Sequence, residues 1–277
     1  LCGAVRQDSQ LGLEETPEEY IESLVSVFRE VRNILTDDGT LWVNLGDSYY
    51  NYRPGKGQAL VKQSVSKTEQ DLPDKCARRG NKLEGLKEKD LIGIPWMLAF
   101  ALRADGWYLR QDIIWHKPNP MPESVRDRCT KSHEYLFLLS KNKKYYYDNE
   151  AIKEPVKQDW GTRNRDAGKY HNPGTGLQPH SGLTKSYERK NKRDVWTITN
   201  KPYKGAHFAV FPPDLIEPCI LAGSQEGDIV LDPFMGSGTT AMVAKKHNRA
   251  NIGCELHEDY ASLQTDRIDS IPCQLML

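Results

Sequence analysis

The N-terminal part of the chain carries a helical pattern of apolar positions. Apolar side chains recur at intervals of three and four residues between Tyr20 and Leu35, and this spacing puts them on one face of an α-helix. Thr16 stands three residues before Glu19, with Pro17 between them. This arrangement is typical of a helix start in which side chains and backbone cap each other. The sequence therefore predicts a helix from residue 17 to about residue 35.

Strand and helix patterns alternate over the rest of the chain. Short runs rich in β-branched and aromatic residues predict strands at 40–45, 107–115, 134–140, 229–231 and 251–254. Helical patterns lie among them, at 91–104, 213–222 and 239–246. Such alternation is typical of a sheet covered by helices on both faces. The sequence therefore predicts an α/β fold with a mainly parallel sheet and with ligands at the carboxyl ends of its strands.

A glycine-containing loop joins the strand at 229–231 to the helix at 239–246. Within it, Gly236 and Gly238 permit backbone angles and close approaches that a Cβ atom would block. The next strand is followed by Glu255, at the position where dinucleotide-type folds place an acid against ribose hydroxyls. The pattern indicates a site for a nucleotide-like ligand.

Three ligand classes use glycine loops of this kind. A triphosphate-binding loop has a lysine directly after its last glycine, and this chain has Thr239 there. A dinucleotide loop has a third glycine, which is missing here, and Asp232 would repel a pyrophosphate. S-adenosylmethionine carries an ammonium and a sulfonium group, so the acids Asp232 and Glu255 match its charges. A plain strand-to-helix turn in an unrelated α/β protein is the remaining alternative.

Residues 232–240 have the sequence Asp-Pro-Phe-Met-Gly-Ser-Gly-Thr-Thr. This resembles the Asp-Pro-Phe-x-Gly-Ser-Gly-Thr-Thr cofactor motif of the permuted DNA amino-methyltransferases, in which that motif lies near the C-terminus. Residues 207–215, 115–120 and 133–139 resemble further motifs of the same family. The resemblance implies a Rossmann-like, S-adenosyl-L-methionine-dependent methyltransferase fold. It implies these cofactor-binding residues: Asp232, Pro233, Phe234, Gly236, Gly238, Thr239, Thr240, Glu255 and Phe211.

The catalytic motif of that family, Ser/Asp/Asn-Pro-Pro-Tyr/Phe, does not occur in these residues. The only adjacent prolines, Pro212 and Pro213, have Phe211 before them and Asp214 after them. In the family the motif lies shortly before a segment like residues 10–14, so we expect it just upstream of Leu1. We also expect the sheet to lack the central strand that carries it. No catalytic residue is therefore assigned. Polar residues that follow predicted strands are candidates for lining the pocket: Asp47, Lys117 and Asn119. An ordinary capping or surface role is the alternative for each of them.

The resemblance implies a site-specific DNA methyltransferase that moves a methyl group from S-adenosylmethionine to an exocyclic base amine. The character of residues 10–14 and 119–128 favours N4 of cytosine. Methylation of adenine N6 is one alternative. A catalytically incomplete fragment that binds only cofactor or DNA is another, and an oxidoreductase that binds a nicotinamide cofactor is a third.

Domain organisation follows from composition along the chain. We expect a single methyltransferase domain over residues 1–277, with an insertion loop at 52–90 and the cofactor-binding part at 205–265. Residues 156–204 contain eleven lysines and arginines against four acidic residues, together with several glycines, and show no periodic apolar face. Basic side chains contact phosphates and polar ones can reach base edges. The 156–204 region is therefore predicted to recognise double-stranded DNA, with a solvated surface loop as the alternative.

Net charge, cysteine spacing and the length of apolar runs argue against several other classes of protein. The net charge of the 277 residues is zero, which argues against a general polyanion binder. The six cysteines show no Cys-x-x-Cys spacing, so neither a disulfide framework nor a metal site is expected. No apolar run is long enough to span a membrane and no signal pattern is present, so a cytoplasmic location is expected. The resemblance allows for a companion restriction endonuclease, while the recognition sequence and the oligomeric state stay open.

Overall fold

The computed structural model describes residues 11–50, 83, 85–156, 188–200, 211–256, 258–269 and 271. Two compact units make up the chain: Leu1–His116 with Pro120–Tyr145, and Lys117–Asn119 with Tyr146–Leu277. Residues 1–10, most of the predicted 52–90 insertion, and residues 157–187 and 201–210, which include most of the predicted 156–204 region, lie outside the described residues. The predictions made for these segments therefore stay predictions.

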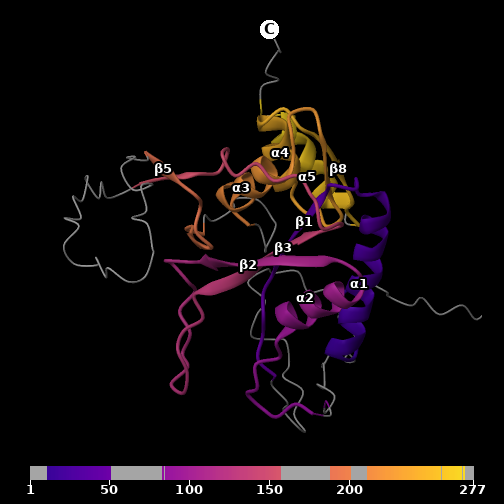
Figure 1. Ribbon diagram of the computed structural model, residues 1–277. Coiled ribbons are helices and arrows are strands. Elements are labelled where there is room, and N and C mark those ends of the chain that lie inside the picture. The colour runs from indigo at the N-terminus through magenta and orange to yellow at the C-terminus, as the bar shows by residue number, and fades with distance from the viewer. Residues whose placement is uncertain are drawn as a thin grey trace, which may run out of the picture. The chain divides into compact units, whose positions relative to one another are not determined.

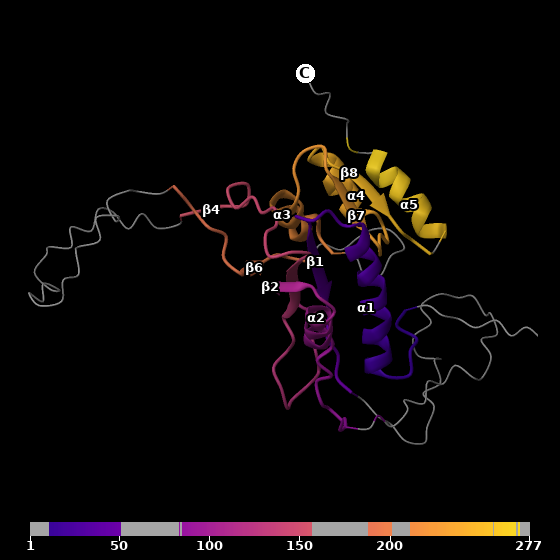
Figure 2. The ribbon, with the colours of Figure 1, turned by 45° about the vertical axis from the view of Figure 1, so that its right-hand side comes forward.

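The first unit contains, in chain order, the elements α1 (Pro17–Ile34), β1 (Thr40–Leu45), α2 (Ile94–Ala104), β2 (Tyr108–His116) and β3 (His133–Ser140) (Figure 1). Strand β3 lies between β1 and β2. Helices α1 and α2 contact each other and lie side by side in Figure 2.

Helix α1 begins as the sequence predicts. The Thr16 hydroxyl accepts a hydrogen bond from the Glu19 N–H at 3.2 Å, and the Glu19 carboxylate accepts one from the Thr16 N–H at 3.2 Å. These reciprocal bonds satisfy donors that the first helical turn would otherwise leave unpaired. The buried face consists of Ile21, Leu24, Phe28 and Val31.

Helix α2 packs on β3 through an aromatic cluster. The Trp96 ring meets the rings of Tyr135 and Phe137 edge-on, with centroid distances of 5.4 and 5.1 Å. Edge-to-face pairs stabilise by about 0.5 to 1.5 kcal/mol beyond their buried area. Phe137 and Leu102 are almost completely buried beside this cluster, so the core of the first unit lies between α2 and the strands.

The strand directions correct the expectation of a mainly parallel sheet. Strand β3 is antiparallel to β1, with Val43 opposite Phe137, and antiparallel to β2, with Ile113 opposite Leu136. No helix separates β2 from β3, and parallel neighbours need a crossover connection that is usually helical. Strands β1 and β2 are joined through α2 and run in the same direction, but β3 lies between them. The described strands therefore include both parallel and antiparallel neighbours. The fold remains in the predicted α/β class.

Helix α2 begins three residues later than the predicted residue 91. Gly93 has a left-handed φ of 86° at the N-cap position, so the regular helix starts only at Ile94. Leu91 instead forms an isolated antiparallel bridge with Tyr49. The end of the helix, at Ala104, agrees with the prediction.

The second unit contains the remaining elements. They are β4 (Glu154–Pro155), β5 (Arg189–Lys190), β6 (Val195–Thr197), α3 (Pro213–Gly223), β7 (Ile229–Asp232), α4 (Thr239–Lys246), β8 (Ala250–Gly253) and α5 (Glu258–Asp269). Strands β7 and β8 are parallel, as predicted, and β4 and β5 are antiparallel. Ile220 of α3 packs on Val243 and Ala244 of α4 in the buried core.

Four elements of this unit were not predicted from the sequence: β4, β5, β6 and α5. The three strands have only two or three residues each, which is too short for an alternating pattern to show. Helix α5 has few apolar residues and therefore little helical periodicity. Of the helices that the structure describes, none has the length and apolar character needed to cross a membrane.

Candidate functional site

The predicted cofactor residues gather where β7 and β8 end. Asp232, the last residue of β7, lies opposite Gly253, the last residue of β8. Two backbone hydrogen bonds continue beyond this pair: Cys254 N–H donates to Asp232 O at 3.0 Å, and Met235 N–H donates to Cys254 O at 2.9 Å. Residues 232–240, called the cofactor loop below, therefore lie beside Glu255 at the carboxyl ends of two parallel strands.

The two glycines of the cofactor loop have conformations that other residues rarely adopt. Gly236 has a φ of 52° and Gly238 a φ of 79°, both in the left-handed region that favours glycine. A Cβ on Gly238 would also lie 3.1 Å from Cγ of Gln264. These positions therefore need glycine for the turn into α4, as the sequence pattern indicates.

The Asp232 carboxylate organises the cofactor loop. Its Oδ1 accepts a hydrogen bond from the Phe234 N–H at 2.9 Å, and its Oδ2 accepts one from the Thr240 hydroxyl at 2.5 Å. The carboxylate thus joins the start of the loop to the first turn of α4. Because an ionised carboxylate has about four acceptor positions, these two bonds leave capacity for a ligand donor.

Glu255 also binds the loop directly. Its Oε2 accepts a hydrogen bond from the Gly236 N–H at 2.8 Å. This contact fixes the half-buried Glu255 side chain next to the glycine turn. The same carboxylate can accept further bonds from hydroxyl groups, which is the role that the sequence predicts for it.

Helix α5 forms hydrogen bonds to the cofactor loop. The sequence did not predict these contacts. Gln264 Nε2 donates to Gly236 O at 2.8 Å, and Arg267 Nη1 donates to Ser237 Oγ at 2.7 Å. The two donors are three residues apart and so share one face of α5. This polar spacing is the one sequence signal that could have identified the contact.

The N-terminus of α4 contributes partial positive charge to the site. Its N-cap is Gly238, which has no side chain to cap the helix. The first N–H groups of a helix have no partner within the helix and carry partial positive charge. The cofactor loop therefore presents an acid, Asp232, close in sequence to a helix end that favours anions. An α-amino acid, with one ammonium and one carboxylate, has matching charges.

Gly253 allows the buried Met235 side chain to lie over the end of β8. A Cβ at this position would come within 2.2 Å of Met235 Cε and 2.8 Å of Met235 Cγ. We expect Gly253→Ala to displace Met235 and to lower the free energy of unfolding by about 1 to 3 kcal/mol, measured by urea denaturation. The matched control is Gly46→Ala, because the nearest atoms to a Cβ there are 3.8 Å away. Equal stability of the two variants would contradict this packing.

Comparison with known proteins identifies the family. The family model described as DNA methylase matches residues 4–266. Type II methyltransferase M.SmaI from Serratia marcescens is 49% identical over 94% of this chain and 77% of its own length. Type II methyltransferase M.Cfr9I from Citrobacter freundii is 46% identical over 94% of this chain and 75% of its own length.

This chain belongs to the DNA methylase family. Membership confirms, at the level of the family, the prediction of an S-adenosylmethionine-dependent DNA methyltransferase.

Solved structures show the same fold. PvuII DNA methyltransferase, described as cytosine-N4-specific, has a TM-score of 0.60 and 17% identity, over 95% of this chain and 75% of that chain. A DNA modification methylase from Thermus thermophilus, complexed with S-adenosyl-L-methionine, has a TM-score of 0.57 and 23% identity, over 96% of this chain and 84% of that chain. The predicted α/β methyltransferase fold is thereby confirmed.

The first unit of the methylase holds one of the predicted pocket residues, Asp47. Its Oδ1 accepts hydrogen bonds from the N–H groups of Ser48, Gly93 and Ile94 at 2.9, 3.0 and 3.2 Å. The carboxylate thus caps the N-terminus of α2, where Gly93 provides no side chain. The bonds show a capping role for Asp47, and a role in the pocket stays a prediction.

The second unit of the methylase holds the other predicted residues. Phe211 is half-buried and lies just before α3, while Lys117 is half-buried and Asn119 is exposed. The Asn119 side chain forms two hydrogen bonds with the backbone of Asn200, which lies in the 156–204 region. The structure therefore joins Asn119 to the predicted DNA-binding region.

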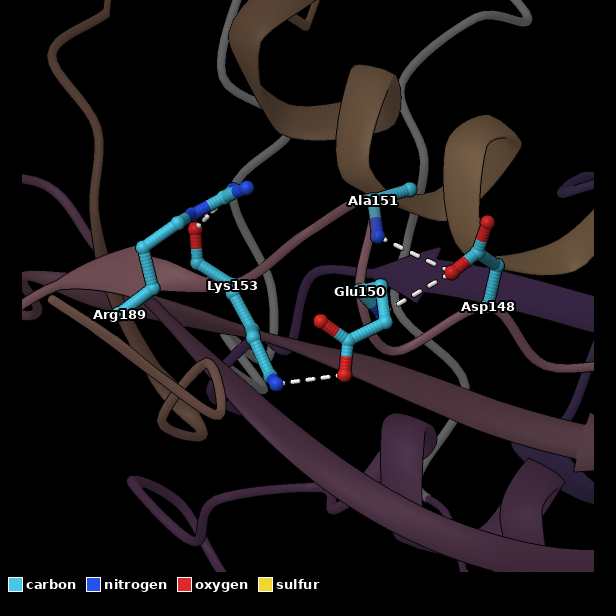
Figure 3. Close-up of polar contacts among 5 residues, drawn as sticks. All are labelled: Asp148, Glu150, Ala151, Lys153 and Arg189. Atoms are coloured by element: carbon cyan, nitrogen blue, oxygen red, sulfur yellow. Dashed lines mark hydrogen bonds and ion pairs between the residues drawn. The ribbon is translucent and has the colours of Figure 1, made fainter. Parts of the chain in front are cut away.

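The described ends of the 156–204 region meet in a short ladder. Residues 153–156 and 188–193, called the neck below, are paired through β4 and β5, with Glu154 opposite Lys190. Val156 N–H donates to Glu188 O at 3.0 Å. Figure 3 shows Arg189 donating to the Lys153 carbonyl oxygen, at 2.7 Å. The neck therefore holds residues 153–156 and 188–193 together within the second unit.

Charged side chains hold the neck together. Glu154 Oε1 lies 2.6 Å from Arg193 Nε and 3.3 Å from Lys190 Nζ. Desolvation by burial raises the pKa of Glu154, but hydrogen bonds from Arg193 and Lys190 outweigh it, so the pKa is lowered overall. Just before the neck, the Asp148 carboxylate accepts hydrogen bonds from the Glu150 and Ala151 N–H groups (Figure 3).

The described parts of the chain contain no group of three or more His, Cys, Asp or Glu side chains that could hold a metal ion. The described cysteines Cys129, Cys219 and Cys254 are free thiols. Burial raises the pKa of the Cys219 thiol, so this group stays protonated and unreactive.

Proposed function

We propose that this chain methylates the N4 amine of cytosine in double-stranded DNA, with the cofactor loop and Glu255 as its S-adenosylmethionine site. The observation that carries the proposal is the cofactor loop itself. It brings the Asp232 carboxylate, the Glu255 carboxylate and the uncapped N-terminus of α4 to the ends of two parallel strands. Ligands of open α/β folds bind at this edge.

The charges of the ligand match the charges of the site. Asp232 would bind the ammonium of the methionine part, and the N-terminal turn of α4 favours its carboxylate. Glu255 would accept hydrogen bonds from the ribose hydroxyls. When bound, S-adenosylmethionine supplies an electrophilic methyl group on a positively charged sulfur.

The target amine needs further groups from the protein. The exocyclic amine of cytosine is a weak nucleophile because its lone pair is delocalised into the ring. A hydrogen-bond acceptor that binds the amine hydrogens would localise this lone pair and raise its reactivity. In the family resemblance, the polar residue and the proline carbonyl of the Ser/Asp-Pro-Pro-Tyr tetrapeptide accept these hydrogens. This tetrapeptide does not occur among the 277 residues.

DNA contacts are assigned to the 156–204 region. A base inside a duplex is out of reach of the donor, so it must be flipped out of the stack while the protein holds the phosphates. The excess of lysine and arginine in the region suits phosphate contacts. In the described part, Arg189 and Lys190 belong to the neck, where β5 pairs with β4. The Type II names of M.SmaI and M.Cfr9I support a companion restriction endonuclease as a partner.

The modified base can be identified directly. A form of the protein that contains the tetrapeptide is incubated with unmethylated plasmid DNA and S-adenosylmethionine, and the digested nucleosides are separated and identified by mass spectrometry. We expect N4-methyldeoxycytidine as the product, because residues 10–14 and 119–128 favour cytosine. The finding of N6-methyldeoxyadenosine would overturn the base assignment and leave the cofactor site intact. No methylated nucleoside at all would overturn the proposed function.

A further inference from the structure

Asn119 lies between two prolines, Pro118 and Pro120. A proline has no backbone N–H to donate, and the residue before a proline is biased toward an extended backbone. The segment from Lys117 to Pro120 therefore favours an extended backbone. It has few backbone N–H groups with which to form hydrogen bonds to a neighbouring strand.

The side chain of Asn119 supplies the missing pairing groups. Its Nδ2 donates to the Asn200 carbonyl oxygen at 3.0 Å, and its Oδ1 accepts from the Asn200 N–H at 3.0 Å. A carboxamide carries the same donor and acceptor as a peptide group. The Asn119 side chain thus takes the place of a backbone unit and pairs with a residue that is 81 positions away in the sequence.

Asn200 lies shortly after β6, near the end of the 156–204 region. Upstream of it, the chain bends at Asp194, and Nε1 of the buried Trp196 in β6 donates to Arg193 O at 2.7 Å. The Lys192 ammonium lies 4.8 Å from the centre of the Trp196 ring, at the distance of a cation–π contact. The described end of the region is then held at Asn200 by the Asn119 amide.

We propose that Asn119 is a positioning residue for DNA recognition. Its amide fixes the end of the 156–204 region to the short segment that carries Lys117. The inference rests on the proposed function, in which the 156–204 region recognises DNA. Asn119 acts through Asn200, and its amide donor and acceptor are both used by that backbone. Asn200, at the end of the described residues 188–200, is thereby held beside the segment that carries Lys117.

Asn119→Ala removes both hydrogen bonds and tests the inference in the full chain. We expect hydrogen–deuterium exchange at the Asn200 amide, without ligand, to become about three- to tenfold faster, because each bond of this kind contributes modestly in water. The matched control is Asn33→Ala, which removes an exposed asparagine of α1, outside the 156–204 region. Exchange at Asn200 should be unchanged in the control.

Recognition is measured by selection from a duplex library with a randomised central sequence. For Asn119→Ala we expect the enrichment of the preferred sequence to fall about three- to tenfold, while calorimetry shows unchanged affinity for S-adenosylmethionine. The inference is overturned if Asn200 exchange is unchanged, or if exchange rises and enrichment does not fall. A wild-type chain that enriches no sequence would instead show that the proposed DNA recognition fails. The control Asn33→Ala should enrich the same sequence as the wild type.

Discussion

Replacing Asp232 with alanine is expected to lower the affinity for S-adenosylmethionine by about a hundredfold or more, because a charged hydrogen-bond partner of the ligand is lost. The substitution also removes the acceptors for the Phe234 N–H and the Thr240 hydroxyl. Isothermal titration calorimetry on the 277-residue chain measures the effect without any need for catalysis. An unchanged dissociation constant would rule out this loop as the cofactor site.

Asp232→Asn separates the charge of Asp232 from its structural role. An asparagine keeps an acceptor for the Phe234 N–H and has an amide that can donate to the Thr240 oxygen. The loop should therefore keep its shape while the negative charge disappears. We expect affinity to fall about tenfold in this variant, because an opposite charge facing the ammonium is lost. Wild-type affinity in Asp232→Asn, with weak binding in Asp232→Ala, would assign Asp232 a structural role only.

The chain without the tetrapeptide is expected to bind S-adenosylmethionine but to transfer methyl groups at least about a thousandfold more slowly than a chain extended to include it. The reason is that no residue assigned in the chain accepts the hydrogens of the target amine. Transfer is measured with a radiolabelled methyl group and unmethylated DNA, for both proteins at equal concentration.

Calorimetry on the same two proteins serves as the control. Equal affinity for S-adenosylmethionine would show that both are folded and that the difference lies in the chemistry. Transfer by the shorter chain at the rate of the extended one would contradict the account. An acceptor for the amine hydrogens would then have to exist among the 277 residues.

The sequence predicts correctly those elements whose stabilising contacts lie within a few residues along the chain. The capping box of Thr16 and Glu19 identified the start of α1 because all its bonds lie within four residues. The cofactor loop was identified because its glycine conformations are set by a strand that leads directly into a helix. The strand direction was not predictable in this way, since it depends on which strands become neighbours.

Long-range contacts explain what the sequence did not show. Asp47 caps a helix that begins 47 residues later in the chain, and Asn119 pairs with Asn200 across 81 residues. Both residues were singled out as polar side chains after strands, but their partners depend on the folded chain. Helix α5 supports the cofactor loop through Gln264 and Arg267, and polar contacts of this kind leave no apolar pattern.

The central claim is that the cofactor loop and Glu255 hold the methyl donor. A crystal structure of the chain grown with S-adenosylmethionine tests this most directly. The account predicts the ligand at the carboxyl ends of β7 and β8, with its ammonium in hydrogen-bond contact with Asp232 and its ribose hydroxyls at Glu255. A ligand bound away from these two carboxylates would contradict it.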